Sequence, residues 1–97
     1  MNDKTIFEMV KEAFIKLEFD VVKDSYKSGI YCITMNSDLP FETNTDIVNY
    51  LNRKASKKLK GNFCVRETQN GSYILYSISS IFGQHALEDL EVLNELL

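Results

Sequence analysis

Hydrophobic residues recur along this chain with two different periods, and the change from one period to the other predicts an order of elements. Three segments have apolar positions three or four residues apart, which is typical of amphipathic helices: 5–17, 43–60 and 84–97. Four shorter segments are rich in β-branched and aromatic residues, which is typical of strands: 19–26, 30–36, 62–68 and 72–79. The sequence therefore predicts the order α-β-β-α-β-β-α.

Turn signals separate the predicted strands into two pairs. Ser28-Gly29 lies between the first two strands, and Asn70-Gly71 lies between the last two. Asn-Gly is the strongest short-range signal for a β-hairpin, because both residues tolerate a positive φ. Pro40 disfavours regular structure in the segment 37–41, which is predicted to be a loop. Each strand pair is thus predicted to be an antiparallel hairpin.

Two hairpins can join into a four-stranded, mainly antiparallel sheet with the helices packed mainly on one face. We therefore predict a single α+β domain over residues 1–97. The helix–strand–strand order occurs twice, yet an offset of 42 residues aligns Gly29 with Gly71, whereas an offset of 43 aligns Tyr31 with Ile74. Internal duplication is therefore left open.

The ends and faces of the helices also have sequence signals. Thr5 and Glu8 have the spacing of a capping box, which predicts the start of the first helix near Asp3 or Thr5. Gly61 is predicted to end the second helix. The last helix is predicted to turn its leucines inward: Leu87, Leu90, Leu93 and Leu97. Its acidic residues are predicted to face water: Glu88, Asp89, Glu91 and Glu95.

Alternation along the strands predicts which side chains face the helices. In the first hairpin the more apolar face comprises Val22, Tyr26, Tyr31, Ile33 and Met35. In the second it comprises Phe63, Val65, Ile74, Tyr76 and Ile78. A two-residue turn at Asn70-Gly71 would place Arg66 directly across from Leu75.

The opposite face of the predicted sheet is mixed in character and is the first candidate for a binding site. Its apolar and basic members form the predicted partner-binding set: Ile30, Cys32, Arg66, Tyr73 and Leu75. Tyrosine and arginine are enriched where proteins meet, and an uncovered apolar patch usually marks an interaction site. Two alternatives stay open: the last helix folds back over this face, or a homodimer forms sheet to sheet.

A basic cluster is the second candidate. It lies at the predicted end of the second helix and comprises Arg53, Lys54, Lys57, Lys58 and Lys60. Residues 53–66 contain no acid, and residues 67–97 contain no lysine or arginine. This asymmetry is the one signal for nucleic acid. Cations at a helix C-terminus also complement the helix dipole, and the chain as a whole is acidic, so the structural interpretation is favoured.

Candidate chemistry is sparse in this sequence. Cys32 and Cys64 lie inside predicted strands, and His85 is the one histidine. A cysteine nucleophile needs an adjacent base, and nothing in the spacing places His85 beside either thiol. A zinc site would lack ligands, since the chain has no CxxC motif. We therefore predict no catalytic residue, no metal and no cofactor.

Composition narrows the class of protein further. The chain has 97 residues, of which 44% are hydrophobic and 26% are charged, with a net charge of −3 and a pI near 5.1. These values are ordinary for a folded domain and argue against disorder. No apolar run approaches the roughly 20 residues of a membrane span, and the N-terminus lacks the features of a signal peptide. A cytoplasmic location is expected.

The order of elements resembles that of type III secretion chaperones and the related YbjN-like proteins. The resemblance rests on a hairpin of the form Gly61-Asn62-Phe63-Cys64-Val65 followed by Asn70-Gly71-Ser72-Tyr73-Ile74-Leu75, and on a closing acidic helix. Those folds usually have an extra strand before the second helix, where this chain has only residues 37–42. The resemblance implies a small, dimeric, non-enzymatic protein that grips an extended segment of another protein.

The sequence thus favours a non-enzymatic protein-binding module: an adaptor, a chaperone or a small inhibitor that acts through a sheet face. The expected partner is another protein, with a homodimer left open and no membrane involved. Two alternatives remain. One is nucleic-acid binding through the basic end of the second helix, and the other is a phage-type inhibitor of a host protein machine.

Overall fold

The computed structural model describes residues 2–79 and 83–97 and has the predicted order of elements. Helices and strands follow one another as α1 (Asp3–Lys16), β1 (Val21–Lys27), β2 (Ile30–Leu39), α2 (Phe41–Lys54), β3 (Asn62–Thr68), β4 (Gly71–Ser79) and α3 (Gln84–Leu96). The α+β fold predicted from the sequence is confirmed.

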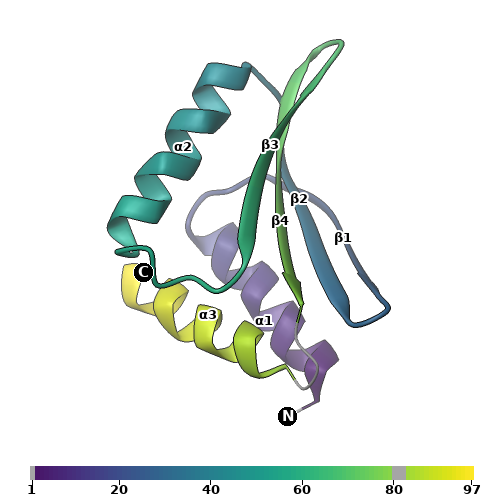
Figure 1. Ribbon diagram of the computed structural model, residues 1–97, viewed down its shortest axis with the longest axis vertical. Coiled ribbons are helices and arrows are strands. Elements are labelled where there is room, and N and C mark those ends of the chain that lie inside the picture. Colours follow the sequence, from purple (N-terminus) through teal and green to yellow (C-terminus); the bar gives the residue numbers. More distant parts are fainter. Residues whose placement is uncertain (1, 80–82) are drawn as a thin grey trace.

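The four strands form one antiparallel sheet in the order β1-β2-β4-β3 (Figure 1). The two hairpins are therefore joined through their second strands, β2 and β4, which occupy the centre of the sheet. Pairing between them runs from Ile30 opposite Ser79 to Met35 opposite Ile74. β1 and β3 become the two edges.

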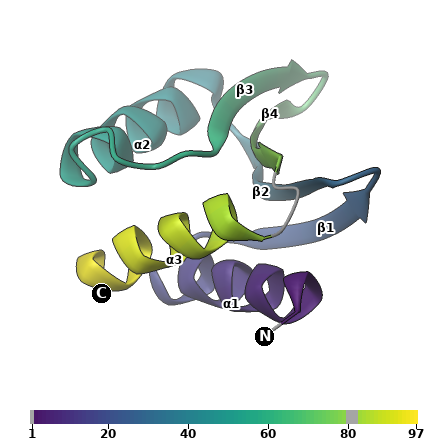
Figure 2. The same ribbon diagram turned by 60° about the horizontal axis from the view of Figure 1, so that its bottom comes forward.

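All three helices lie on one side of this sheet (Figures 1 and 2). α1 packs against α3, while α2 lies over β3 and β4. A single cluster of buried residues joins the helices to the facing side of the sheet, with Tyr31, Ile33, Ile74 and Tyr76 at most 2% exposed. Burial of this apolar surface supplies the main driving force for the fold.

The first hairpin confirms the predicted turn and corrects one face. Ser28 and Gly29 have φ angles of 55° and 77°, which fit a type I′ turn, and Lys27 pairs with Ile30. A β-bulge between Val21 and Lys23 interrupts the alternation. Val22, predicted to face the helices, is 53% exposed as a result, and Val21 packs against the core instead.

The second hairpin turns one residue earlier than predicted. Thr68 pairs with Gly71, so the turn residues are Gln69 and Asn70. Arg66 consequently lies opposite Tyr73, and the prediction that it lies opposite Leu75 is wrong. The observed pairing of β3 with β4 is thus shifted by two residues from the predicted pairing. Every side chain of the hairpin keeps its predicted face, because the side-chain period of a strand is two.

Gly71 serves close packing instead of the turn. A Cβ atom at Gly71 would lie 2.8 Å from the carbonyl carbon of Asp38, and its φ is 151°. The backbone of β2 passes here because β2 continues to Leu39 and does not end at Asn36. The predicted loop 37–41 is therefore largely strand, with Asn36 and Asp38 in left-handed conformations.

α1 begins at Asp3, as predicted, but its cap is Asn2 and not Thr5, whereas both ends of α2 differ from the predictions. Asn2 caps α1, since its side-chain oxygen accepts a hydrogen bond from the Thr5 backbone N–H at 2.9 Å. α2 begins at Phe41, directly after Pro40, and ends at Lys54, well before Gly61. Proline before the first helical turn is favourable because it has no N–H to leave unpaired.

Asp89 is the largest departure from the sequence pattern. It was predicted to face water, yet it is fully buried on α3, between the core and the segment that follows α2. Its carboxylate accepts hydrogen bonds from the Lys60 and Gly61 backbone N–H groups, the latter at 2.7 Å, and from the Tyr76 hydroxyl at 2.6 Å. A buried carboxylate is tolerated when donors satisfy it in this way.

The phenol of Tyr76 is held in its donor state by the same arrangement. Burial, and then the negative charge of Asp89 and the hydrogen bond to it, raise the pKa of Tyr76 above its ordinary value. The hydroxyl therefore stays protonated, and able to donate to Asp89, to a more alkaline pH than an ordinary tyrosine does. Asp89 thus ties α3 both to β4 and to the backbone that leads into β3.

We predict that Asp89→Ala lowers the free energy of unfolding by about 3 kcal/mol, because it leaves buried donors without an acceptor. Urea unfolding at pH 7 measures this change. Glu91→Ala, on the exposed side of the same helix, is the matched control and should change stability by no more than about 0.5 kcal/mol. Equal effects of the two substitutions would show that Asp89 does not anchor the fold.

Candidate functional site

The face of the sheet that points away from the helices is the candidate site, and it is called the outer face below. Side chains alternate between the two faces along each regularly paired strand, so the residues next to core-facing ones lie on the outer face. The central strands contribute Ile30, Cys32, Thr34, Tyr73, Leu75, Ser77 and Ser79. The edge strands contribute Lys23, Ser25, Lys27, Asn62, Cys64, Arg66 and Thr68.

The structure brings all five predicted partner-binding residues together on this face. Ile30 is 46% exposed, Arg66 is exposed, and Cys32, Tyr73 and Leu75 are half-buried. None of the described helices covers them, since α3 buries its apolar side against α1 and the opposite face of the sheet. The alternative in which the last helix folds back over the outer face is therefore wrong.

The outer face is concave on one side of its centre. A depression of about 650 Å³ lies over β1, β2 and β4, and Cys32, Tyr73 and Leu75 form part of its floor. Two of its other residues lie where the sequence pattern did not predict them: Val22 was expected on the helix side and Ser37 in a loop. Both positions follow from local irregularities, the bulge in β1 and the register shift between Met35 and Leu39 in β2, which the sequence does not mark.

Charge is distributed unevenly across the outer face. Lys23 and Lys27 lie on one edge strand and Arg66 on the other, while the two central strands carry no charged residue at their outer positions. Asp24 touches the rim of the depression, but its carboxylate accepts a hydrogen bond from the Tyr31 hydroxyl and pairs with Lys11 on the helix side. The outer face thus has a cationic rim around an uncharged centre, which is called the apolar centre for its residues Ile30, Cys32, Tyr73 and Leu75 and which also contains Thr34 and Ser77.

The two cysteines lie on this face as free thiols, Cys32 half-buried and Cys64 exposed. β4 runs between their strands, so they are separated by two strand spacings, about 10 Å. A disulfide needs Cα atoms within about 7 Å, which excludes a bridge within one chain. His85 contacts the carbonyl oxygen of Ser79 at 3.2 Å, and no hydrogen bond joins it to either cysteine in the described part of the chain.

Two further negative findings apply to residues 2–79 and 83–97. No group of three or more histidine, cysteine, aspartate or glutamate side chains is arranged to hold a metal ion there. No helix in these ranges has the length and apolar character needed to cross a membrane.

The predicted basic cluster is split between two elements. Arg53 and Lys54 lie in the last turn of α2, whereas Lys57, Lys58 and Lys60 lie in the segment that leads to β3. All five side chains are exposed. The ammonium group of Lys54 lies 5.7 Å from the centre of the Tyr50 ring, and Tyr50 is 55% exposed. The cluster is therefore a basic surface with one aromatic side chain.

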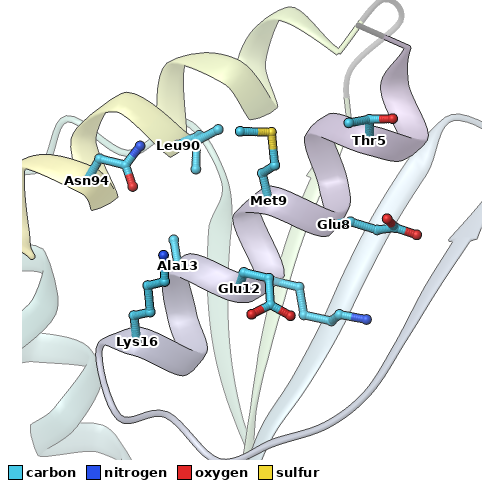
Figure 3. A pocket seen from close by; sticks show the side chains of 9 residues that line it. Thr5, Glu8, Met9, Glu12, Ala13, Lys16, Leu90 and Asn94 are labelled. Carbon is cyan, nitrogen blue, oxygen red and sulfur yellow. The ribbon is translucent and has the colours of Figure 1, made fainter.

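Two grooves lie between helices on the other side of the molecule. The first, of about 570 Å³, runs between α1 and α3, where Met9 points toward Leu90 and the charged side chains of Glu12 and Lys16 stand at the margin (Figure 3). The second, of about 420 Å³, lies between α2 and the ends of α1 and α3, with Ile47 and Leu96 among its apolar residues. Charges of both signs line each groove, so neither selects a partner by charge.

No protein-family model matches the chain, and neither a curated protein nor a solved structure matches it.

Proposed function

We propose that the chain is a cytoplasmic, non-enzymatic protein-binding module that acts as an adaptor, chaperone or small inhibitor through its outer face. The observation that supports this most directly is the apolar centre of that face, which no described helix covers although three helices pack on the other side. A contiguous apolar surface that faces water usually marks an interaction site.

The arrangement of the outer face also supports a protein partner. Protein interfaces commonly have an apolar centre and a polar rim, and tyrosine and arginine contribute many of the strongest contacts. Tyr73 and Leu75 lie on a central strand, and Arg66 lies directly opposite Tyr73. Because hydrogen-bonded strands fix the backbone of this surface, little backbone entropy would be lost when a partner binds.

Charged substitutions at the centre of the outer face test this proposal. We predict that Leu75→Asp and Tyr73→Asp each weaken partner capture by about 2 kcal/mol or more, because a charge would be buried in an apolar interface. The immobilised chain would be used to purify partners from its native host, and the captured proteins quantified for each variant. Light scattering on the same samples tests for a homodimer formed through this face.

Tyr50→Asp and Met9→Asp are the matched controls, because both side chains are exposed and lie on helices on the other side of the molecule. Each variant must first show a cooperative unfolding transition. If the outer-face variants capture the same proteins and keep the same oligomeric state as the unaltered chain, the outer face is not the binding surface.

A second candidate function is nucleic-acid binding by the basic cluster. It is supported by the exposed Tyr50 ring beside Lys54, because aromatic rings next to cations can stack on bases while the cations contact phosphates. The acidic net charge of −3 favours the first proposal over this one.

For this candidate, affinity for a labelled single-stranded oligonucleotide should fall as salt rises, because phosphate contacts release counterions. Replacing Lys57 and Lys58 with glutamine should reduce the slope of log affinity against log salt by about 1.4. Lys16→Gln, an exposed change on α1, is the control. An affinity that does not change with salt would exclude phosphate contacts by the basic cluster.

A further inference from the structure

We infer that the partner of the outer face presents an amphipathic α-helix whose apolar stripe is flanked on both sides by aspartate or glutamate. This inference rests on the proposed function and specifies the chemistry of the partner. It follows from three properties of the outer face: its width, its length and the charge of its rim.

The width of the sheet fits one helix. Neighbouring strands lie about 4.8 Å apart, so the two edge strands of a four-stranded sheet are separated by about 14 Å. An α-helix with its side chains is about 10–12 Å across. A helix along β2 and β4 would therefore place its apolar stripe on Ile30, Tyr73 and Leu75 and its flanking side chains over β1 and β3. The depression, which lies over β1, β2 and β4 on one side of the centre, would receive one flank of such a helix.

The length of the paired region sets the length of the helix. β2 and β4 pair without interruption from Ile30 to Met35. The apolar residues extend one step farther, from Ile30, which lies opposite Ser79, to Tyr73. These six residue steps along β4, at about 3.3 Å each, span about 20 Å, which corresponds to about 13 residues of α-helix. Three to four helical turns would thus be enough to cover the apolar centre.

The rim determines the charge of the partner. Lys23 and Lys27 stand on one side of the apolar centre and Arg66 on the other, and no carboxylate occupies a regularly paired outer position. The described residues contain one ion pair, Lys11 with Asp24, so the three rim cations have no carboxylate partner there. Acidic side chains on both flanks of a docked helix would complement them.

A second copy of the chain does not supply such a helix. α3 is its acidic helix, but the apolar stripe of α3 is already buried in the core, with Ala86 and Leu93 fully buried and Leu90 only 5% exposed. Docking α3 on another copy would require it to leave its own core. The partner helix therefore belongs to a different protein.

Three synthetic peptides of about 14 residues test the inference, the length being set by the span above. They share one leucine and alanine stripe and carry glutamate, glutamine or lysine on both flanks. Each is titrated into the folded, isotopically labelled chain, and backbone amide shifts report where it binds. Circular dichroism reports whether the peptide becomes helical.

We expect the glutamate peptide to become helical, to shift the amides of Ile30, Tyr73 and Leu75, and to bind about tenfold more tightly than the glutamine peptide at low salt. The lysine peptide should bind least. The double variant Lys23→Glu, Arg66→Glu should reverse the order and favour the lysine peptide. Lys16→Glu on α1 is the control and should leave the order unchanged.

Equal binding of the glutamate and lysine peptides, or an unchanged order in the double variant, would overturn the inference. So would a glutamate peptide that shifts amides elsewhere, or tighter binding of the outer face to an oligonucleotide or to phosphatidylglycerol vesicles. If Leu75→Asp abolishes protein capture while no peptide binds, the helical partner is wrong but the protein-binding face stands. If Leu75→Asp leaves capture unchanged, the proposed function fails as well.

Discussion

Everything in this structure depends on the antiparallel pairing of β2 with β4. Each hairpin alone would be marginally stable in water, because it has too little apolar surface to bury. Pairing between Ile30 and Met35 on one strand and residues 74–79 on the other makes one sheet from the two hairpins. That sheet is wide enough to carry three helices on one face, and the same pairing creates the apolar centre of the outer face.

The two faces of the sheet meet different physical requirements. The helix side contains the buried aromatic rings. There the Asp89 carboxylate accepts hydrogen bonds that join α3 to β4 and to the segment before β3. The outer face keeps exposed apolar groups at its centre and places cations on its edge strands. Lysine and arginine on an edge strand also discourage uncontrolled pairing with other sheets, so these residues protect the edges while leaving the centre open.

Sequence reasoning predicted the elements and the strand faces but not the irregular positions. The Ser28-Gly29 turn and the placement of Arg66 on the outer face follow from local signals and from the two-residue period of strands. Val22 was misplaced because a bulge leaves no mark in the hydrophobic pattern. Asp89 was misplaced because its burial depends on backbone donors at Lys60 and Gly61, which only the tertiary structure brings to it. The depression on the outer face was not predicted either, because it is lined in part by Val22 and so depends on the same β-bulge.

The most direct test is to measure how fast single cysteines in β4 react with a thiol reagent. The chain used for it carries Cys32→Ser and Cys64→Ser, so that the introduced cysteine is the one thiol. Leu75→Cys places the thiol on the outer face, and Ile74→Cys places it one residue earlier, in the core. The account predicts that a thiol reagent labels the folded Leu75→Cys chain promptly, while the Ile74→Cys thiol reacts only as the chain unfolds. Equal protection of both thiols, or faster labelling at position 74, would contradict it.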